Sequence, residues 1–260
     1  MNQIQLNSNQ PLALRVQGLE KTYGGGLTSQ TRALDGISFD VPQGQYVAIM
    51  GPSGSGKTTL LNCIATIDKP TAGQIYVGPD NLNALPTRAL ADFRRERIGF
   101  IFQDANLLDT ITVRENIALP LTIGKMKAVE ILRRVEEIAL TLNVDDILDK
   151  YPYQISGGQK QRVAAARAFV TRPHIMLADE PTGSLDSKNA KILLEYLAHL
   201  NSDLGTSILM VTHDSYAASF TERVLFIRDG RIFTELVRGT SSRTDFFDAI
   251  VNVISSIGGV

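Results

Sequence analysis

The stretch Gly51–Thr59, which reads Gly-Pro-Ser-Gly-Ser-Gly-Lys-Thr-Thr, constrains the fold of this chain more than any other feature. It matches the pattern G-x-x-x-x-G-K-[ST], whose glycines let successive backbone N–H groups turn inward around a phosphate while the lysine meets the outer phosphates. An apolar run at 45–50 predicts a buried strand before the loop, and residues 60–65 predict a helix after it. Because a helix N-terminus attracts anions, this order predicts a phosphate-binding site.

The loop pattern alone is suggestive rather than decisive. At ordinary residue frequencies, about one chain in a hundred of this length contains the pattern by accident. In such a chain it would be a Gly-Ser turn without function. The candidate phosphate-binding residues are Gly51, Ser53, Gly54, Ser55, Gly56, Lys57, Thr58 and Thr59.

Length and charge narrow the classes of protein to be considered. A chain of 260 residues forms one large domain or two small ones. With 26 Lys and Arg against 27 Asp and Glu, it has no net charge to attract nucleic acid or an anionic membrane surface. This charge balance leads us to expect no nucleic-acid partner. The single cysteine, Cys63, excludes an internal disulfide and fits a reducing compartment.

The sequence also predicts no direct insertion into a membrane. No run approaches the roughly 20 apolar residues needed to cross a bilayer. Residues 1–10 are polar and lack the basic start and apolar block of a secretory signal. Any membrane role is therefore expected to come through a partner.

Hydrophobic periodicity predicts the framework around the loop. Residues 12–17 and 37–41 alternate apolar and polar side chains, which predicts an antiparallel edge sheet. Residues 125–142 have helical spacing, with Glu130 and Arg134 four apart on the outer face. They belong to a mostly helical insert over about 110–153.

Two strand-like segments end in polar side chains. Gln103 follows residues 98–102, and His213 follows residues 207–212. The carboxyl ends of parallel strands meet at one edge of a sheet, where ligands bind, so both side chains are candidates to face a ligand. A histidine at a strand end is more often a surface residue, but here it is a credible donor to a γ-phosphate.

Two adjacent carboxylates, Asp179 and Glu180, close the apolar run at 174–178. Acids at the end of a buried strand are costly unless they meet a cation or a reacting water. In phosphate-loop enzymes the first acid holds Mg²⁺ together with the residue after the lysine, here Thr58. The second acid can orient the attacking water, so the pair predicts hydrolytic chemistry rather than a solvent-facing strand end.

A second glycine cluster lies at Ser156, Gly157, Gly158 and Gln159, just before a predicted helix at 161–170. A hydroxyl and exposed N–H groups at a helix start form an anion site, although a turn that only caps the helix is the simpler interpretation of the cluster alone. Tyr23, beside a glycine-rich loop, could stack on an adenine. Its position alone favours an unattached loop tyrosine.

Taken together, these motifs resemble in order and spacing the ATP-binding-cassette (ABC) ATPases, over about residues 14–233. The resemblance implies an α/β fold: a P-loop NTPase core with a mostly parallel sheet, an antiparallel β edge subdomain and a helical signature subdomain. Residues 1–260 would then form a single ABC ATPase domain. Its helical subdomain would span about 104–165, and a closing helix about 244–258.

The family also implies roles for the matching positions, with ATP and Mg²⁺ as cofactors. Lys57 would bind the β- and γ-phosphates, Glu180 would be the general base, and His213 would stabilise γ-phosphate charge. Mg²⁺ would be held by Thr58, Asp179 and Gln103.

The same resemblance implies contacts beyond the phosphates. Tyr23 would stack on adenine. Ser156–Gln159 would serve the ATP of a second copy of the chain, so that the enzyme acts as a homodimer. Gln103 and the surface near Asn106–Leu108 would meet a membrane subunit.

Two sets of short motifs indicate a narrower branch. Residues 177–183 and 113–117 resemble the macrolide-exporter, lipoprotein-release and cell-division ATPases. Residues 65–68 and 102–108 more closely resemble the bacitracin-type ATPases of antimicrobial-peptide resistance. The resemblance implies a separate integral membrane permease as partner, with the chain at the cytoplasmic face of the bacterial cell membrane. Similar systems also signal to a sensor kinase, and the sequence leaves that link open.

Two other classes of function fit the sequence less well. A soluble ABC ATPase of the DNA-repair type would need long coiled-coil arms, for which the interval from Thr59 to Ile155 leaves no room. One of the translation-factor type would carry two phosphate loops, and only one is present. A regulatory module that binds ATP without hydrolysing it is disfavoured because both Glu180 and His213 are present. We therefore expect an ATPase that drives transport.

Overall fold

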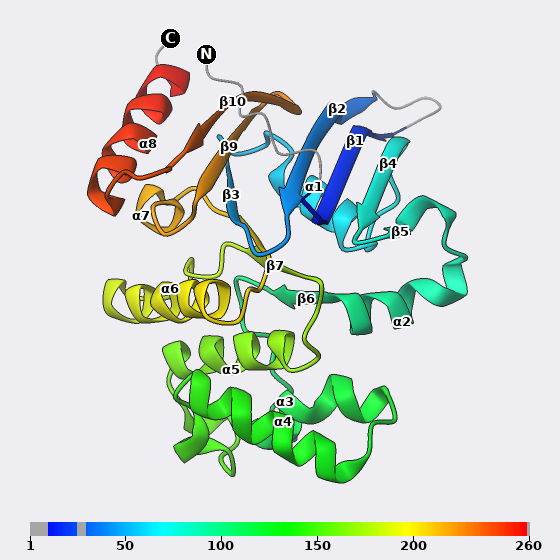
Figure 1. Ribbon diagram of the computed structural model, residues 1–260, viewed down its shortest axis with the longest axis vertical. Coiled ribbons are helices and arrows are strands. Elements are labelled where there is room, and N and C mark those ends of the chain that lie inside the picture. Colours follow the sequence, from blue (N-terminus) through cyan, green and yellow to red (C-terminus); the bar gives the residue numbers. More distant parts are fainter. Residues whose placement is uncertain (1–9, 25–29, 259–260) are drawn as a thin grey trace.

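A computed structural model describes residues 10–24 and 30–258 (Figure 1). Residues 1–9, part of the segment examined for a secretory signal, and residues 25–29, the glycine-rich loop after Tyr23, lie outside the described part, as do residues 259–260. The described chain forms two sheets, one of six strands and one of four, with helices around them.

The six-stranded sheet carries the loop predicted to bind phosphate. Its strands lie in the order β10-β9-β3-β8-β7-β6, and all are parallel except β10, which pairs antiparallel with β9. They span Tyr46–Met50 (β3), Ile98–Ile101 (β6), Ile175–Asp179 (β7), Ile208–Val211 (β8), Arg223–Arg228 (β9) and Arg231–Val237 (β10). The central strands read as continuous apolar runs because helices or the second sheet cover both of their faces.

Alternate residues of these strands enter two separate cores. Val47 and Ile49 of β3 pack with helix α1 (Lys57–Ile64) and with the four-stranded sheet. Ala48 and Met50, which point the other way, pack with α6 (Ser187–Ser202) and with the helices that follow β6. The loop between β3 and α1 is thus held at the sheet edge by packing on both faces.

The four-stranded sheet is antiparallel, as the alternation predicted. Its order is β2-β1-β4-β5, with bounds Leu12–Tyr23 (β1), Thr31–Pro42 (β2), Ala72–Val77 (β4) and Asp80–Asn81 (β5). Strand β1 is longer than the predicted 12–17 because pairing resumes beyond Gly18, which has φ 54° and lies within a register shift. That irregularity interrupts the period-two pattern without ending the strand.

The remaining helices surround the two sheets. They are α2 (Thr87–Arg97), α3 (Val113–Ile123), α4 (Ala128–Thr141), α5 (Gly157–Phe169), the short α7 (Ser215–Ala218) and α8 (Arg243–Gly258). Short 3₁₀ turns span Leu82–Ala84, Asp145–Ile147 and Pro152–Gln154. Helices α3, α4 and α5 pack on one another below the six-stranded sheet in Figure 1. Helix α8 buries Phe246 and Ile250 against the same core.

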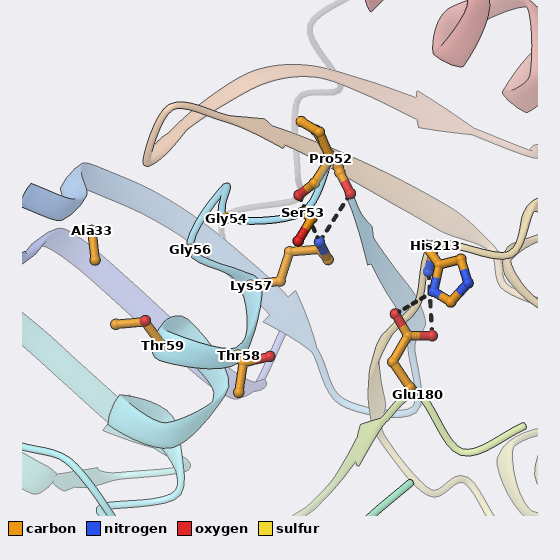
Figure 2. A pocket seen from close by; sticks show the side chains of 11 residues that line it. Ala33, Pro52, Ser53, Gly54, Gly56, Lys57, Thr58, Thr59, Glu180 and His213 are labelled. Atoms are coloured by element: carbon orange, nitrogen blue, oxygen red, sulfur yellow. Dashed lines mark hydrogen bonds and ion pairs between the residues drawn. The ribbon is translucent and has the colours of Figure 1, made fainter. Parts of the chain in front are cut away.

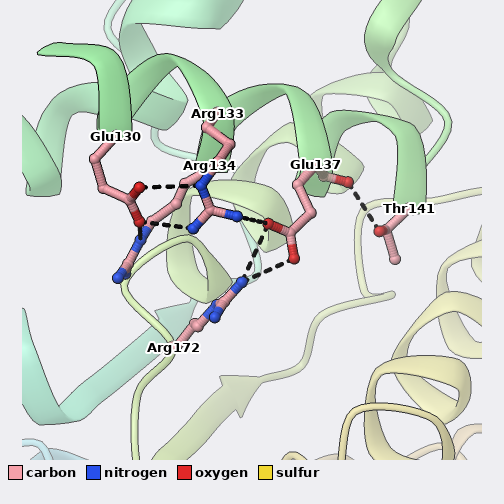
Figure 3. Close-up of polar contacts among 6 residues, drawn as sticks. All are labelled: Glu130, Arg133, Arg134, Glu137, Thr141 and Arg172. Carbon is pink, nitrogen blue, oxygen red and sulfur yellow. Dashed lines mark hydrogen bonds and ion pairs between the residues drawn. The ribbon is translucent and has the colours of Figure 1, made fainter.

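Ion pairs cover the outer face of α4 and connect it to the loop after α5 (Figure 3). The predicted pair is present, since Arg134 Nε donates to Glu130 Oε1 at 2.8 Å. Hydrogen bonds from Arg133 and Arg134 lower the pKa of Glu130 to about 2. Glu137, about two turns further along than Glu130, accepts from Arg172 at 2.8 Å. These contacts are exposed or partly exposed, so we assign them to surface structure rather than to chemistry.

Within residues 10–24 and 30–258, every helix is too short or too polar to cross a lipid bilayer.

Candidate active site

The loop between β3 and α1 has the backbone shape that its glycines allow. Gly56, which precedes the first residue of α1, has φ 100°, and a Cβ there would lie 2.4 Å from the carbonyl oxygen of Ala33 in β2. A Cβ at Gly51 would lie 2.1 Å from the carbonyl oxygen of Ile227 in β9. Only glycine fits a loop this close to two strands. Among the described residues no side chain caps α1, so its first N–H groups face the loop.

Lys57 folds back over the loop. Its Nζ donates to the carbonyl oxygens of Gly51 and Pro52, both at 2.9 Å. Burial lowers the pKa of Lys57, and the carboxylates of Glu180 and Asp179 partly oppose that effect. A phosphate bound in the loop would therefore replace these two carbonyl oxygens as the partner of the Lys57 ammonium group.

A cavity of about 620 Å³ opens over this loop (Figure 2). Lys57 and Thr58 lie on one side of it, and Glu180 and His213 lie on the other. Its lining residues are Ala33, Gly51, Pro52, Ser53, Gly54, Gly56, Lys57, Thr58, Thr59, Glu180 and His213. The structure thus brings together most of the residues predicted to bind phosphate and two of the predicted strand-end residues. Ala33 and Pro52 were not anticipated, and Ser55 lies buried beneath the loop.

Glu180 and His213 form a pair at the ends of β7 and β8. The Nδ1–H of His213 donates to Glu180 Oε1 at 2.8 Å. The other ring nitrogen, Nε2, takes no part in this hydrogen bond. Glu180 has φ 46°, an uncommon value for a residue with a side chain, while its backbone N–H donates to the carbonyl oxygen of Val211 at 2.9 Å. Backbone strain of this kind is concentrated at functional sites, and here it accompanies a carboxylate at the cavity.

Asp179 has an electrostatic environment that suits a cation. Its Oδ1 is buried and has no hydrogen-bond partner among the described residues. Burial raises the pKa of Asp179, the neighbouring charge of Glu180 adds to this, and Lys57 partly opposes it. An ionised carboxylate oxygen without a donor is stabilised strongly by a metal ion.

Gln103 and Tyr23 lie outside the lining of this cavity. The side chain of Gln103 packs against Gly183, where an added Cβ would lie 3.0 Å from Nε2. The hydroxyl of Tyr23 donates to Asp68 at 2.6 Å, and the Lys21 ammonium sits 4.7 Å from its ring centroid. Their assigned contacts with Mg²⁺ and adenine therefore remain predictions.

The second glycine cluster also lies away from the cavity, at the N-terminus of α5. Ser156 and Gln159 form a reciprocal capping box, since Gln159 Oε1 accepts from the Ser156 N–H at 2.9 Å and the Ser156 hydroxyl accepts from the Gln159 N–H at 3.3 Å. Ser156 and Gly157 are exposed, whereas Gly158 packs against Asn189 of α6. One chain alone does not bring this cluster to its own phosphate loop.

The fold and the site define an ATP-binding cassette. Residues 34–183 match the family described as ABC transporter, which is more than half of the chain, so this protein belongs to that family. The predicted fold class is confirmed, and the chain is an ATPase and the ATP-binding subunit of an ABC transporter.

The relatives include one from the narrower branch that the short motifs indicated. The chain is 50% identical over 247 residues to YvcR of Bacillus subtilis, an uncharacterized ABC transporter ATP-binding protein, covering 95% of each sequence. It is 49% identical to the bacitracin export ATP-binding protein BceA of Halalkalibacterium halodurans, over 95% of this chain and 97% of that one. The resemblance to bacitracin-type ATPases is therefore confirmed.

A solved structure shows the same fold as a dimer. The ATP-binding cassette MJ0796, a protein of Methanocaldococcus jannaschii, has been determined as a dimer in a post-hydrolysis state with ADP and phosphate. It superposes with a TM-score of 0.77 at 39% identity, over 86% of this chain and 98% of that one.

Proposed function

We propose that this chain hydrolyses ATP between two copies of itself and thereby drives a separate membrane permease that confers resistance to antimicrobial peptides. The observation that carries the catalytic part is the pair of Glu180 and His213, which faces Lys57 across the cavity. The phosphates of ATP would occupy the loop, with Lys57 exchanging its two carbonyl contacts for the β- and γ-phosphates.

Mg²⁺ fits the residues beside this cavity. Asp179 supplies a buried carboxylate oxygen without a donor among the described residues, and Thr58 supplies a hydroxyl at the cavity. These oxygen ligands are of the kind that Mg²⁺ prefers, and Gln103 would join them after moving from Gly183. When bound, the ion would neutralise phosphate charge.

Glu180 is assigned the role of general base or water-orienting residue. Its Oε1 accepts from the His213 ring at 2.8 Å and its Oε2 accepts from the His213 backbone N–H at 3.4 Å, which holds the carboxylate at the cavity. Oε2, with the longer contact, keeps a lone pair for a water. His213, with its side chain 75% exposed, can turn its Nε2 toward the γ-phosphate.

The homodimer is proposed because the site in one chain is incomplete. Ser156 and Gly157 are exposed at the start of α5, away from the cavity of their own chain. Their hydroxyl and N–H groups would reach the γ-phosphate of ATP held by a second copy. The dimeric state of MJ0796 supports this arrangement.

Glu180→Gln tests the catalytic assignment. The amide keeps the size of the side chain and the phosphate contacts but cannot accept a proton, so we expect ATP to bind while turnover falls by at least about a hundredfold. Turnover is measured as phosphate release by the purified chain. A wild-type rate in this variant would exclude Glu180 as the base.

The permease and the peptide substrate are tested in cells. We expect a bacterium that expresses this chain with its permease to tolerate more bacitracin than one that expresses the permease with Glu180→Gln. We place the chain at the cytoplasmic face of the membrane, bound to the permease. The permease should therefore copurify with the chain in detergent. Recovery of a sensor kinase in the same preparation would support the indirect signalling link.

Each part of this proposal can fail separately. If ATP is hydrolysed but bacitracin tolerance is unchanged, the substrate class is wrong and lipoprotein release, macrolide export or cell division becomes the better assignment. If only ribosomes or DNA copurify, the transport assignment itself fails.

A further inference from the structure

Helix α5 contains a buried amide, Gln161, that none of the contacts described above uses. Its side chain is 1% exposed. Its Nε2 donates to three backbone carbonyl oxygens: Phe102 at 3.0 Å, Gln103 at 2.6 Å and Pro181 at 3.1 Å. Because all three neighbours are acceptors, the nitrogen must face them. Its Oε1 is buried and has no donor among the described residues.

The three carbonyl groups belong to two segments that leave neighbouring strands. Phe102 and Gln103 follow β6, and Pro181 follows Glu180 at the end of β7. The hydroxyl of Ser184 donates to the same Gln103 carbonyl at 3.1 Å, which joins the two segments a second time. Gln161 therefore connects the turn of the candidate general base with the segment of a candidate Mg²⁺ ligand.

Helix α5 continues to hold the first of these segments further along its length. Arg167 donates to the carbonyl oxygens of Ala105 at 2.9 Å and Asn106 at 2.8 Å. Burial lowers the pKa of Arg167. The segment from Phe102 to Asn106 is thus bound to α5 at both of its ends.

These contacts make the position of α5 and the geometry of the catalytic turn interdependent. Gln161 lies little more than one helical turn beyond Ser156, where the helix begins. A shift of the first turn of α5 must either carry the three carbonyl groups with it or leave them buried without a donor. Small displacements of catalytic groups strongly reduce rates.

We propose that Gln161 is a positioning residue for ATP hydrolysis, which aligns the Glu180 turn and the Gln103 segment with the helix that begins at Ser156. It acts through their backbone carbonyl groups and does not touch ATP. This inference rests on the proposed roles of Glu180 and of Ser156–Gln159.

Gln161→Met tests the proposal, because methionine has a similar shape but donates no hydrogen bond. The matched control is Arg162→Met on the same helix, since Arg162 donates to the carbonyl oxygens of Leu142 and Asn143 at the end of α4. We expect kcat of Gln161→Met to fall at least about tenfold while KM for ATP changes less than about threefold. Arg162→Met should lower Tm with kcat within about twofold of wild type.

A double-mutant cycle separates positioning from general destabilisation. If Gln161 acts through Glu180, adding Gln161→Met to Glu180→Gln should leave the residual rate within about twofold of Glu180→Gln alone. Multiplicative losses, or a Gln161→Met variant that loses only Tm, would overturn the proposal. A Glu180→Gln variant with wild-type turnover would instead overturn the proposed function.

A second substitution covers the case in which Gln161→Met does not fold. Gln161→Asn keeps the amide but withdraws it by one methylene, so the same loss of kcat and the same cycle are expected. Rates equal to wild type in a folded Gln161→Asn would equally overturn the positioning role.

Discussion

The partly buried carboxylate of Asp179, near Lys57 of the phosphate loop, reduces the stability of the folded chain. Burial raises its pKa, so the folded state favours the protonated carboxyl, and Oδ1 has no donor among the described residues. A carboxyl group with a raised pKa binds protons more readily in the folded than in the unfolded chain. Its contribution to stability is therefore lost as the pH rises from its ordinary pKa through its raised one.

Asp179→Asn should accordingly stabilise the ligand-free chain at neutral pH. We expect Tm to rise by roughly 2–4 °C, equivalent to about 1 kcal/mol in a chain of this size, because the amide removes a desolvated charge. Differential scanning calorimetry without ATP or Mg²⁺ measures this, and the gain should shrink as the pH falls through the raised pKa of Asp179, because the carboxyl group itself then becomes protonated. The same variant should lose Mg²⁺-dependent turnover. An unchanged or lower Tm at neutral pH would contradict the assigned environment.

Among single residues, those that directly follow a parallel strand could be predicted from the sequence to lie at the site. Glu180 and His213 meet because parallel strands end at one edge, a rule that needs no coordinates. Ala33 could not be found in this way, since only its backbone approaches Gly56. Gln161 did leave a signal, because it shares a face of α5 with the buried Ala165, four residues later. A polar residue on an apolar helix face is a candidate for such a role.

At the scale of elements, the phosphate loop depends on how closely β2 and β9 approach it. Gly56→Ala would place a methyl group 2.4 Å from the Ala33 carbonyl at φ 100°. We expect a strain of about 1–3 kcal/mol and at least a tenfold loss of ATP affinity, measured by calorimetric titration. Gly157→Ala is the control for folding and for ATP binding by the monomer, because among the described residues no atom outside its chain neighbours and its own helix backbone lies within 4 Å of the added Cβ. Equal affinities in the two variants would contradict this view of the loop.

Helices and strands could be predicted where the spacing of apolar residues stays regular along the whole element. The β3 strand and α4 were found by their apolar patterns, and α4 begins at Ala128 rather than Lys125 because Lys125 has φ 56°. The extent of β1 was missed, since Gly18 breaks its alternation while both neighbouring strands continue to pair. Tertiary pairing decides such boundaries, and the local pattern does not contain it.

At the scale of the whole molecule, one chain holds a cavity with Lys57 and Glu180 but leaves Ser156 and Gly157 exposed elsewhere. The order of motifs predicted the family, yet it could not show which motifs meet within a single chain. We therefore expect ATP to join two copies of the chain, each completing the site of the other.

The mass of Glu180→Gln in solution tests this ATP-dependent dimer. Light scattering after size-exclusion chromatography should give about 28.4 kDa without nucleotide and about twice that mass with ATP and Mg²⁺, because the unhydrolysed γ-phosphate joins the phosphate loop of one copy to Ser156–Gln159 of the other. The dimer should not form with ADP. A mass that stays at 28.4 kDa with saturating ATP would contradict the account.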